Sequence, residues 1–118
     1  MPVFELKTNI AEEKIPKNLA INLVSVVADA LHKPAEYVVV EIKGSCNLSF
    51  GGTNEPAGLG KLASIGGINR ESNKVLSKKI MAYLEKELGL SSARIYIQFI
   101  DLSKECVGFK GTTFDDFL

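Results

Sequence analysis

The sequence has no tryptophan, one histidine and two cysteines, and these shortages exclude several classes of function. A lone His32 has no partners for a histidine-based catalytic triad or a metal cluster, and we interpret it as a helix-end residue. Cys46 and Cys106 are far apart and show neither a C-x-x-C pair nor the spacing of metal ligands. We therefore predict two reduced thiols, no metal site and no cofactor.

An excess of charge of either sign is also missing, because 14 basic residues balance 14 acidic ones. Neither sign forms a long block, so no nucleic-acid partner and no membrane partner is expected. No apolar run is long enough to span a membrane, and no basic segment followed by an apolar one resembles a secretory leader. These absences predict a cytoplasmic protein.

The 118 residues, 46% of them hydrophobic, predict a single domain over residues 1–118. Alternation and β-branched runs predict strands, whereas apolar residues at helical spacing predict helices. The expected strands are 2–7, 37–42, 46–50, 59–65 and 94–101, with one short edge strand in the tail. The expected helices cover about 16–31 and the segment from Asn69, as N-cap, to Leu88.

A strand, a helix and a strand follow one another twice, which predicts two pseudo-repeats over about 1–58 and 59–118. Two such units form an α/β (α+β) fold, a four-stranded mixed sheet with both helices on one face. Nothing in the chain covers the other face, although it includes apolar residues. An uncovered apolar face favours partner subunits.

The first strand begins with Pro2, a residue small enough for the preceding Met1 to be removed. The processed chain would then carry a secondary amine on a rigid strand. An α-amine has a pKa of roughly 7.7–8, and burial or a nearby cation would lower it toward neutrality. On the dipeptide alone, the favoured interpretation is that Met1-Pro2 has no functional meaning.

Several short motifs, in one order along almost the whole chain, resemble the macrophage migration inhibitory factor and D-dopachrome tautomerase family. The motifs are Met1-Pro2-Val3-Phe4, Thr8-Asn9, Lys33-Pro34, Leu48-Ser49-Phe50-Gly51-Gly52-Thr53, Ser64-Ile65-Gly66, Arg94-Ile95-Tyr96-Ile97, Val107-Gly108-Phe109 and Gly111-Thr112-Thr113-Phe114. The resemblance implies a tautomerase-like fold assembled as a homotrimer.

The resemblance also implies roles for individual residues. Pro2 would be the catalytic base of a keto–enol exchange, and Lys33 would meet the carboxylate of a small aromatic keto or enol acid and lower the pKa of the amine. Further residues would bind the substrate, with Tyr96 and Gln98 reaching in from the neighbouring subunit. These residues are Ser64, Ile65, Tyr37, Tyr96, Gln98, Val107, Phe109 and Phe114.

Each assignment has a structural alternative. Lys33 follows a helix, where a cation offsets the helix dipole, and without the resemblance this is the favoured interpretation. Tyr96 and Phe109 could pack on a sheet, and Ser64-Ile65-Gly66 could be a strand end.

The sequence also departs from the family pattern. Ala57-Gly58-Leu59-Gly60 stands where some members have C-x-x-C, Gln98 replaces asparagine, and Phe109 stands where tryptophan is often found.

The resemblance implies two competing functions. One is a cofactor-free phenylpyruvate or dopachrome-type tautomerase that uses Pro2. The other is a cytokine-like signalling protein, secreted without a leader, which binds cell-surface receptors and for which the pocket is incidental. The presence of both Pro2 and Lys33 favours retained catalysis.

Overall fold

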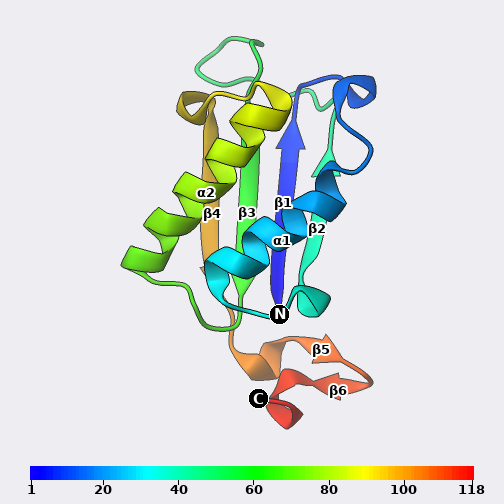
Figure 1. Cartoon of the computed structure of the whole chain (residues 1–118), viewed down its shortest axis with the longest axis vertical. Helices are drawn as coiled ribbons and strands as arrows, with labels where there is room; N and C mark the ends of the chain where they lie inside the picture. Colours follow the sequence, from blue (N-terminus) through cyan, green and yellow to red (C-terminus); the bar gives the residue numbers. More distant parts are fainter.

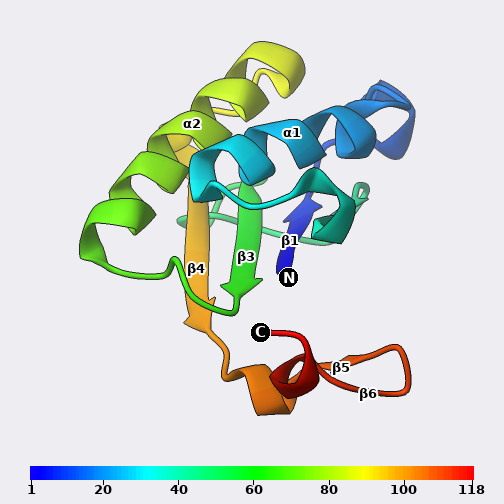
Figure 2. The ribbon, with the colours of Figure 1, turned by 60° about the horizontal axis from the view of Figure 1, so that its bottom comes forward.

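The computed structural model describes residues 1–118 and has two long helices over one sheet (Figures 1 and 2). The sheet strands are β1 (Pro2–Thr8), β2 (Val39–Lys43), β3 (Gly58–Ser64) and β4 (Ile95–Asp101). The helices are α1 (Leu19–Leu31) and α2 (Arg70–Leu88). A separate hairpin of β5 (Gly108–Phe109) and β6 (Thr112–Thr113) lies beyond one end of the sheet.

The sheet has the order β2-β1-β3-β4 and is mixed. β1 is parallel to β2, β3 is parallel to β4, and the central pair β1 and β3 is antiparallel. In the central pair Pro2 lies opposite Ser64 at one end, and Thr8 lies opposite Gly58 at the other. The predicted fold class, a four-stranded mixed sheet with both helices on one face, is confirmed.

The helix boundaries follow from local chemistry. Asn69 caps α2, since its side chain accepts a hydrogen bond from the Ser72 backbone N–H, and Gly89 ends the helix with a left-handed φ of 68°. His32 ends α1 in the same left-handed region, with a φ of 55°, as its expected helix-end role requires. Lys33 follows this turn directly, so the end of α1 determines the position from which the Lys33 side chain extends.

The core lies between the sheet and the helices. Phe4, Leu6 and Leu62 project from the sheet toward fully buried side chains of both helices. The fully buried helix residues are Leu23, Val27, Leu76, Ile80 and Leu84. A Cβ at Gly60 would lie 3.2 Å from the Phe4 ring, so the missing side chain allows the ring to lie tightly against β3.

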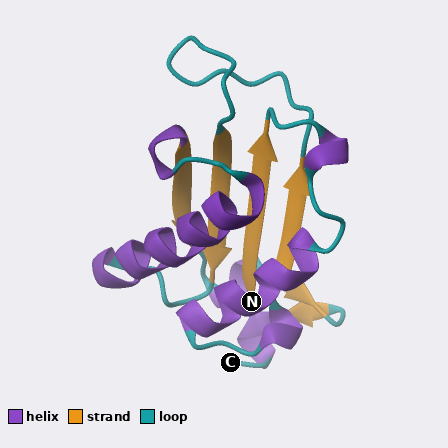
Figure 3. Ribbon diagram, turned by 45° about the horizontal axis from the view of Figure 1, so that its top comes forward, coloured by secondary structure: helices purple, strands orange, loops and turns teal.

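Both long helices lie on the same face of the sheet (Figure 3), which leaves the other face without a helix. The strand register aligns three rows of residues across this face: Val39, Val3, Ala63 and Ile100, then Glu41, Glu5, Lys61 and Gln98, and finally Lys43, Lys7, Leu59 and Tyr96. The first row is apolar, yet Val39 is 56% exposed and Ile100 is 40% exposed. The expected uncovered face with apolar residues is therefore present.

Four predicted elements were wrong in detail. The strand expected over 37–42 is β2, which begins at Val39 because Ala35–Tyr37 form a short 3-10 turn. Helix α1 begins at Leu19, because residues 17 and 18 form a turn in which the Pro16 carbonyl accepts from the Leu19 N–H. Residues 46–50 form no strand and contribute only a bridge between Phe50 and Thr53. The tail forms a hairpin of its own, with a two-residue turn, in place of an edge strand on the main sheet.

No helix combines the length and apolar character required to cross a membrane.

Candidate functional site

A cavity of about 200 Å³ lies where the start of β1, the end of α1 and the C-terminal hairpin meet. Both ends of the chain lie at this end of the sheet (Figure 1). The walls are mainly apolar and aromatic, and two lysines border them. The lining residues are Met1, Lys33, Pro34, Tyr37, Phe109, Lys110, Phe114, Phe117 and Leu118.

The amine at the start of β1 and the Lys33 ammonium both border this cavity. Burial, and secondarily the charge of Lys33, lower the pKa of the Met1 α-amino group below its ordinary value. The next residue, Pro2, is buried and begins the strand, so the rigid sheet determines where an amine at this position lies. This corner of the protein therefore shifts the protonation equilibrium of an amine toward its neutral form.

Lys33 is held by its backbone and by its side chain. Its N–H donates to the Ala28 carbonyl, and its Nζ donates to the Ile65 carbonyl at 3.0 Å. No carboxylate lies within ion-pair distance of Nζ, because the only ion pair of the chain joins Lys104 to Asp115. A half-buried ammonium without a counter-ion favours binding of an anionic group in the cavity.

Ser64 provides a second unsatisfied polar group near Pro2. The residue is fully buried, and its Oγ has no hydrogen-bond partner, although its carbonyl accepts from the Leu102 N–H at 2.9 Å. A buried hydroxyl without a partner costs about 1–3 kcal/mol. Ser64 lies opposite Pro2 in the register, but it is fully buried and does not line the cavity itself.

The aromatic wall comes from two separate parts of the chain. The rings of Phe109 and Phe114 are stacked, with centroids 4.9 Å apart and planes 1° apart. Tyr37 meets Phe109 edge-on, with centroids 6.0 Å apart. Val107 supports the wall through its carbonyl, which accepts from the Phe114 N–H at 3.0 Å, and does not line the cavity.

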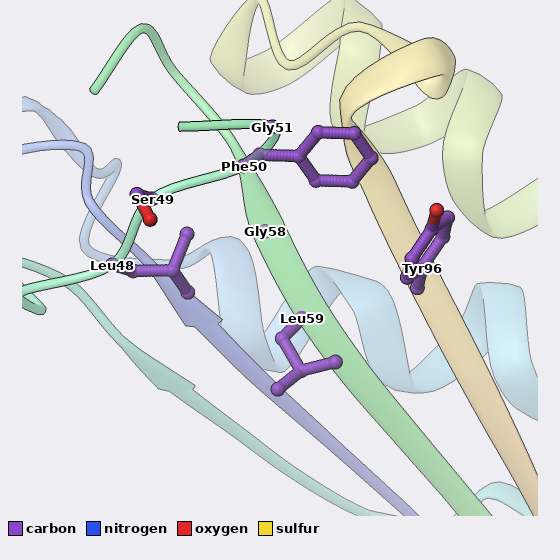
Figure 4. Close-up of a pocket in the computed structure, with 7 residues that line it drawn as sticks. All are labelled: Leu48, Ser49, Phe50, Gly51, Gly58, Leu59 and Tyr96. Atoms are coloured by element: carbon purple, nitrogen blue, oxygen red, sulfur yellow. The ribbon is translucent and has the colours of Figure 1, made fainter. Parts of the chain in front are cut away.

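Tyr96 and Gln98 lie elsewhere. Tyr96 is paired with Leu59, roughly 17 Å along β3 from Ser64, at the strand rise of about 3.3 Å per residue. Its ring borders a second cavity of about 300 Å³, where it lies against Phe50 with centroids 5.0 Å apart (Figure 4). Gln98 is exposed on the uncovered face, opposite Lys61. Within one subunit, neither residue joins the cavity beside Met1.

The sequence analysis missed Met1, Pro34, Lys110, Phe117 and Leu118 as lining residues. The spacing of Phe109, Phe114 and Phe117 was a signal for one aromatic cluster, but nothing local indicated that the tail turns back onto the cavity. No group of three or more His, Cys, Asp or Glu side chains is arranged to hold a metal ion.

The fold and this cavity together define a class of small protein: two strand–helix–strand units, with an amine and a lysine at one aromatic-lined end of the sheet. The family model for macrophage migration inhibitory factor matches residues 1–115. The macrophage migration inhibitory factor homolog of Trichinella spiralis is 42% identical over 114 residues, which cover 97% of this chain and 100% of the relative. The macrophage migration inhibitory factor of Xenopus tropicalis is 38% identical over 97% of this chain and 99% of its own length.

Among solved structures, the macrophage migration inhibitory factor from Trichinella spiralis superposes with a TM-score of 0.91 and 40% identity, covering 94% of this chain and 98% of the other. The chain therefore belongs to the macrophage migration inhibitory factor family. Membership supports a function of this family's general type, tautomerase or cytokine.

Proposed function

We propose that the chain, once Met1 has been removed, is a cofactor-free keto–enol tautomerase that acts on small aromatic keto acids of the phenylpyruvate or dopachrome type. The observation that carries the proposal is the aromatic cavity bordered by Met1, whose α-amine is partly desolvated directly before Pro2, and by the Lys33 ammonium, which has no counter-ion. Its volume of about 200 Å³ lies below the roughly 300–1,000 Å³ of sites for drug-sized ligands and suits one ring with a short side chain.

The proposed reaction begins with the substrate carboxylate on Lys33 and its ring against the wall formed by Tyr37, Phe109 and Phe114. The neutral Pro2 amine takes a proton from the carbon beside the carbonyl. The C–H electron pair forms the carbon–carbon double bond, and the carbonyl oxygen takes a proton from water to give the enol. The Pro2 ammonium then returns its proton to water, so the isomerisation consumes no co-reactant.

Ser64 and Ile65 complete the proposed inner end of the site. The unpartnered Ser64 hydroxyl would accept a hydrogen bond from the Pro2 ammonium after proton transfer. The Ile65 carbonyl holds Lys33 in position through the 3.0 Å hydrogen bond. In this proposal both groups orient the two cationic centres.

We further propose a homotrimer in which Tyr96 and Gln98 of one subunit complete the pocket of the next. The uncovered sheet face, with its exposed Val39, Tyr96 and Ile100, supports an assembly that buries it. A closed ring of identical contacts would bring the Tyr96 end of one sheet toward the Pro2 end of its neighbour.

A phenylpyruvate keto–enol assay tests the proposal, on protein whose N-terminus has been verified by intact mass. We expect turnover by the chain beginning at Pro2 and little by the chain that retains Met1, because the Pro2 nitrogen is then a non-basic amide. Equal rates for the two forms would contradict the assignment of Pro2 as the base.

The names of the relatives favour a second candidate, a cytokine-like protein released without a leader that binds a cell-surface receptor. A Pro2→Gly variant separates the two functions. A cell-migration response that survives the loss of turnover would assign the signal to the surface of the protein and leave the pocket incidental.

A further inference from the structure

The cavity has a second cation at the hairpin end, Lys110, for which the proposed reaction has no use. Lys110 and Gly111 form the two-residue turn between β5 and β6, with φ angles of 51° and 80°. Two successive left-handed residues are typical of the type I′ hairpin turn, which has a fixed shape. The turn therefore determines where the Lys110 side chain begins.

The Lys110 ammonium lies over aromatic rings and has no counter-ion. Its Nζ is 5.3 Å from the centroid of Phe109 and 5.9 Å from that of Phe117. Both distances are within the range of cation–π attraction, which orients the side chain without neutralising its charge. The chain's only ion pair involves a different lysine, Lys104. Lys110 therefore keeps an unneutralised positive charge at the edge of the cavity.

Phe117 forms the outer part of the same wall. It meets Phe109 and Phe114 edge-on, with centroids 5.6 Å and 6.2 Å away, and remains 47% exposed. Its N–H donates to the Phe114 carbonyl at 3.0 Å. Lys104 fixes the segment from outside, because its Nζ donates to the Leu118 carbonyl at 3.2 Å and pairs with Asp115. Phe117 lies beyond the residues that match the family model.

We propose that Lys110 and Phe117 form an outer subsite that binds an anionic substituent on the ring of the ligand. The site would then prefer aryl keto acids that carry a second acidic group, such as a ring carboxylate, over those with an unsubstituted ring. The inference rests on the proposed function for the position of the keto acid at Lys33. With that end fixed, a ring along Phe109 directs its far edge toward the Lys110 ammonium.

Binding of ligands that cannot tautomerise tests the subsite separately from catalysis. The pair is 3-phenylpropionate and 3-(4-carboxyphenyl)propionate, with Kd measured by calorimetry on the chain beginning at Pro2. The wild type should bind the dicarboxylate more tightly, and Lys110→Gln should reduce this preference about two- to five-fold, as for an exposed ion pair. Higher salt should reduce it in the same direction.

Two further variants define the part played by Phe117 and by total charge. Phe117→Leu should weaken both ligands about two- to ten-fold through the loss of aromatic contacts, whereas Phe117→Tyr should retain the affinity. Lys79→Gln removes the same charge from the exposed part of α2, outside the cavity, and should leave the preference unchanged.

In turnover, Lys110→Gln should raise KM for 4-carboxyphenylpyruvate more than for phenylpyruvate.

The outcomes separate the two proposals. If phenylpyruvate turns over but Lys110→Gln leaves the ratio of the two Kd values unchanged, or changes it no more than Lys79→Gln does, the subsite is wrong and the proposed function stands. If the ratio depends on Lys110 but no keto acid turns over, the subsite stands and the tautomerase proposal fails. Binding of neither ligand by the wild type would overturn the subsite.

Discussion

The two cavities at opposite ends of the sheet differ in the cations that border them or, at the second cavity, lie against a lining ring. At the β1 end, Lys33 and Lys110 have no carboxylate partners. At the other end the cation is Arg94, which lies 5.2 Å over the Phe50 ring and donates to the Pro56 and Glu55 carbonyls and to the Thr53 hydroxyl, at 2.9, 3.0 and 2.9 Å.

Cavity size alone does not select the proposed site. The cavity near Arg94, at about 300 Å³, is larger than the one beside Met1, at about 200 Å³. Its guanidinium is already satisfied by the loop that it holds, whereas the smaller cavity has unpaired ammonium groups and an amine with a lowered pKa. Unused hydrogen-bonding and charge capacity is therefore the better guide to the site.

Replacing Pro2 should have the largest effect on this comparison. Pro2→Gly keeps an N-terminal amine but loses the secondary amine and its rigid placement. We expect turnover to fall by about 100-fold or more, the contribution of a positioned general base, while the fold is retained. Steady-state kinetics with circular dichroism would measure both. A variant with nearly full activity would show that the base lies elsewhere.

Removing the Lys33 charge should have the next largest effect. Lys33→Ala should raise KM for phenylpyruvate about ten-fold or more, since hydrogen bonds to charged groups contribute about 1.5–3 kcal/mol, and should affect methyl esters much less. Lys33 lowers the pKa of the Met1 α-amine, and we expect the same effect on the Pro2 amine of the processed chain. Loss of Lys33 should then raise that pKa and move the rise in activity to higher pH. Burial of the amine, the larger cause of the lowered pKa, is not changed by this substitution.

Lys33→Arg is the matched control, because it keeps a cation beside the amine. Its pH profile should stay close to that of the wild type. An unchanged pH profile and unchanged ester selectivity in Lys33→Ala would return Lys33 to the role of a helix-end cation.

Mixed oligomers would test whether the two ends of the sheet meet between subunits. A Pro2→Gly chain and a Tyr96→Phe/Gln98→Ala chain, refolded together, should recover activity in about one quarter of the sites of randomly assembled threefold rings. A pocket formed within one subunit would show no recovery above the average of the two parent proteins. The measurement is specific activity against mixing ratio.

Arg94 should have the smallest effect on turnover. Arg94→Gln removes hydrogen bonds that hold residues 53–56, so we expect the free energy of unfolding to fall by about 1–3 kcal/mol in urea titrations. Activity per folded protein should stay unchanged. A large loss of turnover without loss of stability would mean that Arg94 itself contributes to the chemistry.

Much of the fold could be predicted because its signals are local. Alternation indicated β1 and β4, a β-branched run indicated β2, apolar spacing indicated both helices, and Asn69 marked the start of α2. Predictions failed where a long-range contact decides the structure. Residues 46–50 look suitable for a strand but have no neighbouring strand to pair with in the subunit. The later start of α1 has a local cause instead, the turn closed by the Leu19 N–H and the Pro16 carbonyl.

By itself the sequence determined the fold class, the resemblance, and the candidates Pro2, Lys33, Tyr37, Phe109 and Phe114, which lie at one end of the sheet. Only the tertiary structure decided that the amine is desolvated beside Lys33, that Ser64 has a hydroxyl without a partner, and that Lys110 and Phe117 turn back onto the cavity. The physical reason is that strand and helix signals act over a few residues. Burial, ion pairing and ring contacts instead depend on segments that are far apart in the sequence and that folding brings together.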